Sequence, residues 1–102
     1  MEIHFQTEKL RKIIEDESLL TRKHGELARK ITQRYKELQA ADCLQDMPPA
    51  AGTHPLHNNR DGQYGLTLKQ PYRMIIRPVG DFNPPDTASI VAIEIIEITD
   101  YH

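Results

Sequence analysis

Histidine, arginine and tyrosine side chains gather in the second half of the chain, and together they have the chemical types needed to cleave RNA without a metal. Cleavage by the RNA's own 2′-hydroxyl requires a base, an acid for the departing 5′-oxygen, and positive charge on the phosphate. Histidine serves as acid or base near neutral pH, arginine offers a planar fork to phosphate oxygens, and tyrosine stacks on a splayed base or shares a proton. The group comprises His54, His57, Arg60, Arg73, Arg77, Tyr101 and His102. The same pattern is also explained by a loop histidine and a terminal histidine that have no chemical role.

Other kinds of chemical site have no signature in the sequence. His54 and His57 are three residues apart but lack the Cys or carboxylate partners of a zinc site, so no metal or other cofactor is expected. There is no glycine-rich phosphate loop and no serine-centred elbow. Cys43 is the one cysteine and cannot form an internal disulfide, which favours a reducing cytoplasm and an inert thiol.

Length and charge limit the kind of protein that the sequence can encode. The 102 residues predict a single domain, residues 1–102, with one core. No apolar run approaches the roughly 20 residues that span a bilayer, and the N-terminus lacks the pattern of a secretion signal, so no membrane association is expected. The first 47 residues carry nine basic and nine acidic side chains, and the remaining 55 carry four and six. Any RNA-binding surface is therefore expected to be small and local.

The first half of the chain predicts a short strand followed by two helices. Residues 3–5 alternate with polar neighbours as in a strand, and Thr7 is placed to cap a helix that Gly25 would end. A second helix is predicted over residues 26–41, because its apolar residues mark one face. These apolar residues are Leu27, Ile31, Tyr35 and Leu38. The charged residues Arg29, Lys30, Arg34, Lys36 and Glu37 are expected on its solvated surface.

The second half predicts three strands after a proline-containing connector. Residues 63–69 and 72–77 alternate with a period of two around a short turn, which indicates a hairpin, and residues 89–98 form a β-branched run. The sequence therefore predicts an α+β fold with an N-terminal strand, a two-helix hairpin, and an antiparallel sheet of three further strands with the helices on one face. The face not covered by helices, here called the open face, would present Gln63, Thr67, Arg73 and Arg77, with the chain end nearby.

Three stretches of the chain carry a more specific pattern. They are HPL at 54–56 followed by Arg60 and GQY at 62–64, then PYRMII at 71–76, and finally the terminal DYH. Together with the order of elements, these stretches resemble the HigB-like (killer protein) branch of the RelE/ParE superfamily of type II toxin–antitoxin systems. That branch has a pattern like HPLKGDRxGxY, an aromatic-Arg strand and a terminal DYH.

The resemblance implies a RelE-like fold and a toxin that cuts mRNA on the ribosome and so inhibits translation. Such a toxin would be silenced in a hetero-oligomer with a cognate antitoxin, expected to be a helix-turn-helix protein. The resemblance maps His54, Asp100, Tyr101 and His102 onto catalytic positions and Arg73 onto a phosphate-contacting catalytic position. His57, Arg60 and Arg77 are expected to contact RNA, although Arg60 could instead fix its loop, Asp100 could only orient His102, and Arg77 could solvate the sheet.

The sequence departs from the family pattern after HPL, where His57-Asn58-Asn59 replaces Lys-Gly-Asp. One fixed positive charge is lost, and His57 replaces it only when protonated. Asn58 stands where the family has a glycine, and asparagine tolerates the left-handed backbone better than most residues.

Two other functions fit the same sequence. The superfamily also contains ParE-like gyrase inhibitors, which bind protein without catalysis, and fold alone does not decide function. A weakened, non-toxic module that only binds its antitoxin is the third interpretation. The terminal DYH and His54 favour the nuclease, whereas the acidic balance and the change at residues 57–59 favour the non-toxic module.

Overall fold

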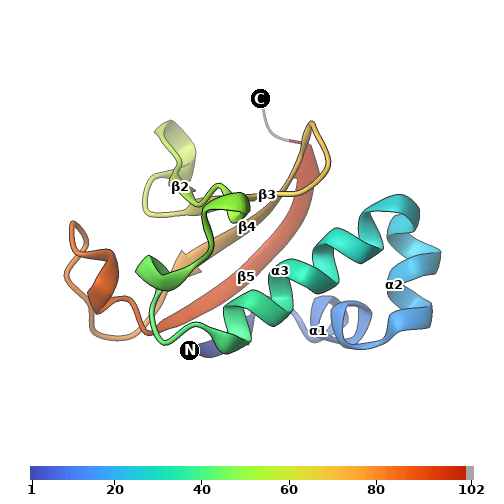
Figure 1. Cartoon of the computed structure of the whole chain (residues 1–102), viewed down its shortest axis with the longest axis horizontal. Helices are drawn as coiled ribbons and strands as arrows, with labels where there is room; N and C mark the ends of the chain where they lie inside the picture. The colour runs from blue at the N-terminus through green and yellow to red at the C-terminus, as the bar shows by residue number, and fades with distance from the viewer. Residues whose placement is uncertain (101–102) are drawn as a thin grey trace.

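The computed structural model describes residues 1–100, which form an α+β fold of one five-stranded sheet with its helices packed against one face (Figure 1). The elements in chain order are β1 (Glu2–Phe5), α1 (Glu8–Glu15), α2 (Glu17–His24), α3 (Ala28–Ala40), β2 (His54–Pro55), β3 (Tyr64–Thr67), β4 (Tyr72–Pro78) and β5 (Ala92–Asp100). The sheet order is β1-β5-β4-β3-β2. The pairing of β1 with β5 is parallel and the other pairings are antiparallel, so the sheet is mixed.

The first predicted helical segment is divided into α1 and α2 at Asp16. Thr7 begins α1 as predicted, because its hydroxyl accepts a hydrogen bond from the Leu10 N–H at 3.1 Å. Asp16 is extended and its carboxylate accepts from the Leu19 N–H at 3.1 Å, so it ends one helix and caps the next. Gly25 ends α2 with a positive φ of 49°, which confirms the predicted stop. The break lets α2 turn away from the axis of α1 and lead into α3 (Figure 1).

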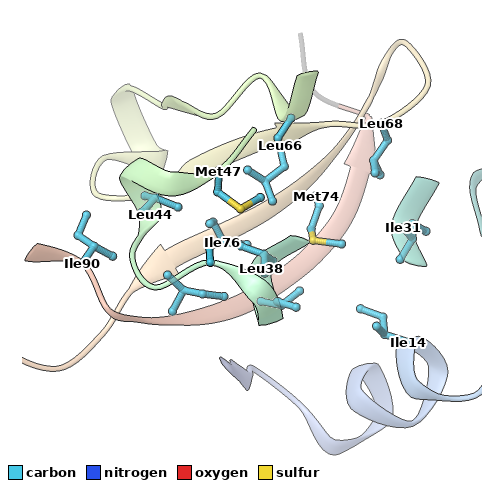
Figure 2. Packing of buried hydrophobic residues seen from close by; sticks show 14 of the residues in the cluster. Ile14, Ile31, Leu38, Leu44, Met47, Leu66, Leu68, Met74, Ile76 and Ile90 are labelled. Carbon is cyan, nitrogen blue, oxygen red and sulfur yellow. The ribbon is translucent and has the colours of Figure 1, made fainter. Parts of the chain in front are cut away.

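Two apolar clusters lie on opposite faces of the sheet. The larger one joins helix residues such as Ile14, Ile31 and Leu38 to Met74 and Ile76 of β4 (Figure 2). The smaller cluster lies on the open face and contains Leu56, Ile75 and Ile96. Ile96 is the extra residue of a bulge, since β5 pairs Glu97 with Ile75 but Ile95 with Ile76. The alternation predicted for β4 is confirmed, because Arg73 and Arg77 lie on the same face of the strand as Ile75.

The prediction that the charged residues of α3 are solvated is wrong for Arg34, whose exposed fraction is 1%. Its guanidinium donates to the Thr67 carbonyl and the Ala50 carbonyl at 2.8 Å each, and to the Glu37 carboxylate at 2.9 Å. These acceptors compensate the cost of burying the charge. The helical spacing already placed Arg34 on the apolar face with Ile31 and Leu38, which was the signal for its burial.

Candidate active site

Side chains from β2 and β4, the two strands that flank β3, converge over Gly65 on the open face. Gly65 of β3 pairs with His54 of β2, and the adjacent β4 supplies Arg73. A Cβ added at Gly65 would lie 3.7 Å from His54 Cε1, 3.9 Å from Arg73 Cδ and 3.4 Å from Leu56 Cδ2. The structure therefore brings together His54 and Arg73, two of the residues predicted to be catalytic, from positions that are 19 residues apart in the sequence.

The His54 ring is held by a contact that favours one tautomer. The side chain is exposed, and its Nδ1 lies 2.9 Å from the carbonyl oxygen of Gly52. Because a carbonyl only accepts hydrogen bonds, the neutral ring carries its proton on Nδ1 and leaves a lone pair on Nε2. A histidine with a free Nε2 lone pair can act as a base.

Position 52 requires glycine for two reasons, its backbone conformation and its closeness to Thr67. Its φ of 58° is in the left-handed region, and a Cβ at this position would collide with the Thr67 side chain. Arg34 binds the carbonyls of Ala50 and Thr67, which lie on the two segments that meet here. The carbonyl that orients His54 is therefore tied to the buried core through Arg34.

Arg73 differs from the other two predicted arginines because no described carboxylate forms an ion pair with it. Its guanidinium donates to the Tyr72 carbonyl at 3.0 Å and to Gln70 Oε1 at 3.4 Å. Both acceptors are neutral, so the positive charge of Arg73 remains available to an anion. Gln70 was not predicted, and it belongs to the turn that joins β3 to β4.

Arg60 and Arg77 are each paired with a glutamate of β5. Arg60 Nη2 lies 2.8 Å from Glu97 Oε2, and Arg60 Nη1 donates to Gln63 at 2.9 Å. Arg77 Nε lies 2.7 Å from Glu94 Oε1, and Arg77 is about 13 Å from Arg73 along the strand at the usual rise per residue. Both guanidinium charges are thus largely compensated, and Arg60 fixes its loop as the structural alternative expected. Glu94 and Glu97 were missed as partners, although charged residues within a run predicted to be buried require partners.

His57 lies on the exposed loop that connects β2 to β3. Its side chain has no hydrogen-bond partner within residues 1–100, and it precedes the 3-10 turn Asn58–Arg60. Asn58 has a φ of 61°, which confirms that this position requires the left-handed backbone expected from the glycine of the family pattern.

Asp100 lies on the other face of the sheet from Arg73. Asp100 pairs with Tyr72, and Arg73 pairs with Thr99. Directly opposed residues of antiparallel strands share a face, so Asp100 lies on the same face of the sheet as Tyr72. Neighbouring residues of a strand lie on opposite faces, so Arg73 is on the other face. Tyr101 and His102, the remaining predicted catalytic residues, lie outside the described residues.

No protein-family model matches the sequence, and a search of curated proteins gives no match. Within residues 1–100, no helix has the length and apolar character needed to cross a membrane. In the same part of the chain, no group of three or more His, Cys, Asp or Glu side chains is arranged to hold a metal ion.

Proposed function

We propose that the chain is a RelE-like toxin of the HigB branch that cleaves mRNA by metal-independent acid–base catalysis. The observation that carries the proposal is the His54 imidazole, whose Nε2 has no hydrogen-bond partner within residues 1–100, beside the one open-face arginine that no described carboxylate neutralises. These are the base and the phosphate-binding cation that cleavage by a 2′-hydroxyl requires.

In this mechanism His54 Nε2 takes the proton of the 2′-hydroxyl, whose oxygen attacks the adjacent phosphorus. Arg73 binds the non-bridging phosphate oxygens and stabilises the negative charge that develops on them. The bond to the 5′-oxygen breaks and leaves a 2′,3′-cyclic phosphate. In this proposal the 5′-oxygen is protonated by Tyr101 or His102, which the resemblance maps onto catalytic positions, and Asp100 has a supporting role.

Dependence on the ribosome is supported by the small amount of unpaired positive charge around His54 and Arg73. Affinity for free RNA grows with the number of phosphates that lysine and arginine neutralise. Arg60 and Arg77 are paired with glutamates, which leaves Arg73 as the main fixed cation beside His54. An mRNA already held by the ribosome does not require a broad basic surface. The proposed partners are therefore the ribosome with its mRNA, and a helix-turn-helix antitoxin that silences the toxin.

The same ion pairs also support a second candidate, a non-toxic module that binds the antitoxin without cleaving RNA. With Glu94 and Glu97 on the open face and His57 in place of a lysine, phosphate binding would be weaker than in a fully basic site.

Induced expression of the intact chain in a bacterium without the antitoxin, followed by mapping of RNA 5′ ends, tests the proposal. The intact chain should arrest growth and produce new mRNA ends, and His54→Ala and Arg73→Ala should each abolish both effects. Loss of a general base typically costs about a hundred- to ten-thousand-fold in rate, and loss of an electrostatic donor about a hundred- to a thousand-fold. Arg29→Ala, on an exposed turn of α3, is the matched control and should remain toxic.

Each alternative gives a different result. Growth arrest that persists in both variants without new RNA ends would exclude catalysis and favour the gyrase-inhibiting function. An intact chain that is harmless at high expression would favour the non-toxic module. Thermal unfolding of each purified variant should match that of the intact chain, because Arg73 and His54 lie outside the large apolar cluster.

A further inference from the structure

Helices α1 and α2 form a groove of about 570 Å³ with an apolar floor and a basic rim. The lining residues from α1 are Glu8, Lys9, Lys12 and Ile13, and those from α2 are Leu19, Arg22 and Lys23. Apart from Glu8, both sets follow the spacing i, i+3, i+4, so each helix presents one continuous face to the groove. Each face contributes one branched apolar residue and two cations, and α1 adds the acidic Glu8.

The break at Asp16 creates this groove. An unbroken helix would have continued the apolar stripe, whereas α2 buries Leu20 in the core and leaves Leu19 only half-buried beside Ile13. The exposed parts of Ile13 and Leu19 therefore form an apolar floor that the rest of the described chain does not cover.

The groove also concentrates positive charge in a chain whose net charge is −2. None of its four cations forms an ion pair with a carboxylate within residues 1–100; they are Lys9, Lys12, Arg22 and Lys23. Glu8, the one acidic residue in the lining, is already paired with Arg11 of the same helix. The rim can therefore accept several negative charges without losing contacts of its own.

We propose that this groove binds an acidic amphipathic helix of a protein partner. Apolar side chains of the partner would cover Ile13 and Leu19, and its carboxylates would meet the lysines and the arginine of the rim. Each groove helix has eight residues, which is about 12 Å of helix, so the partner needs two turns with apolar residues three or four apart between acidic ones. A nucleic acid backbone would use the cations but would leave the apolar floor uncovered.

The groove is independent of the His54–Arg73 site. The helices cover the face of the sheet opposite the open face, so a partner helix seated between α1 and α2 would leave His54 and Arg73 accessible (Figure 1). The proposal does not rest on RNA cleavage and would stand if the chain had no nuclease activity.

Fluorescence anisotropy with the full chain and a labelled helical peptide tests the proposal. The peptide carries two leucines four residues apart flanked by glutamates, and a second peptide has serines in place of the leucines. The leucine peptide should bind saturably and more weakly at high salt. Its affinity should fall at least about tenfold, or 1.4 kcal/mol, for Lys12→Glu/Lys23→Glu and for Leu19→Ser. The double reversal Arg29→Glu/Lys36→Glu, on exposed positions of α3, is the matched control and should bind normally.

Three outcomes would overturn the proposal. The first is equal binding of the leucine and serine peptides, and the second is unchanged affinity after the Lys12 and Lys23 reversals. The third is binding of a short single-stranded RNA, in place of the peptide, that depends on Lys12 and Lys23 but not on Leu19. Ile13→Ser should lower the peptide affinity as Leu19→Ser does. Because Ile13 is on α1, this agreement would show that loss of the apolar floor, and not a local change in α2, weakens binding.

Discussion

The His54 imidazole and the Arg73 side chain both border Gly65, at 3.7 Å and 3.9 Å from where a Cβ of that residue would stand. These distances are ordinary van der Waals contacts for a methyl group, and Gly65 has no unusual backbone angle. The absence of a larger side chain at Gly65 therefore lets the His54 imidazole and the Arg73 side chain border the same position.

Gly65→Val is expected to reduce cleavage by about a hundredfold, because its Cγ atoms would separate His54 from Arg73 and a displacement of about 1 Å can have that effect. Gly65→Ala is the matched control, and it should keep cleavage within a few-fold of the intact chain. Single-turnover cleavage of ribosome-bound mRNA measures both variants. Equal rates for Val and Ala at this position would show that the spacing of the two side chains does not matter.

His57→Lys is expected to strengthen RNA binding at about pH 8 and to make it less dependent on pH than in the intact chain. Lysine is charged throughout this range, whereas histidine contributes charge only when protonated. At that pH, the slope of log affinity against log salt concentration should steepen by the amount that one additional phosphate contact contributes. Comparison with His57→Gln isolates this residue from the other histidines. Parallel pH profiles for the intact chain and the lysine variant would exclude a phosphate-binding role for His57.

Much of the sheet could be predicted because its signals are local. The period of two in residues 72–77 correctly separated Met74 and Ile76 from Arg73 and Arg77, and Thr7 and Gly25 marked real helix ends. The division at Asp16 was missed because Leu19 and Leu20 continue the apolar pattern across it. The parallel pairing of β1 with β5 depends on contacts between the two ends of the chain, which alternation within a strand does not reveal.

The sequence predicted the types of the side chains that meet at Gly65 but not the ion pairs around them. β2 has only two residues, too few to show alternation, so the position of His54 over Gly65 follows only from pairing with β3. The ion pairs of Arg60 and Arg77 depend on the register of β5, which the bulge at Ile96 shifts by one residue. A register set by such a bulge is a tertiary property, and no pattern of spacing in the sequence specifies it.

Arg34→Met is expected to lower the free energy of unfolding by about 3 kcal/mol, because it leaves the Thr67 and Ala50 carbonyls and the Glu37 carboxylate without their donor. Arg29→Met, on the exposed side of the same helix, should have little effect. Urea unfolding measures both variants. A stability loss below about 1 kcal/mol would show that packing of the methionine stabilises the fold as much as Arg34 and its ion pair do, and that the carbonyls find other donors.

The stability of the chain is expected to fall as the pH drops from about 7.5 to about 5.5, and His24 is expected to cause part of that fall. Burial at the end of α2, and secondarily the charge of Lys23, lowers the pKa of His24 below the ordinary histidine value of 6.5. The unfolded chain therefore binds a proton at a higher pH than the folded chain does. The contribution of His24 is intact above the unfolded pKa and declines as the pH falls from there toward the lowered folded pKa.

Urea unfolding of the intact chain and of His24→Gln at both pH values measures this contribution, and the loss of stability should be smaller in the variant. The carboxylates whose pKa values are lowered, Glu8 and Glu26, titrate below 4.5 and do not contribute in this range. Lys23→Met should also reduce the loss, because removal of the neighbouring positive charge raises the pKa of His24 toward its ordinary value. If the intact chain and His24→Gln lose the same stability over this interval, the pH dependence arises from other histidines and burial of the His24 ring has no energetic consequence for folding.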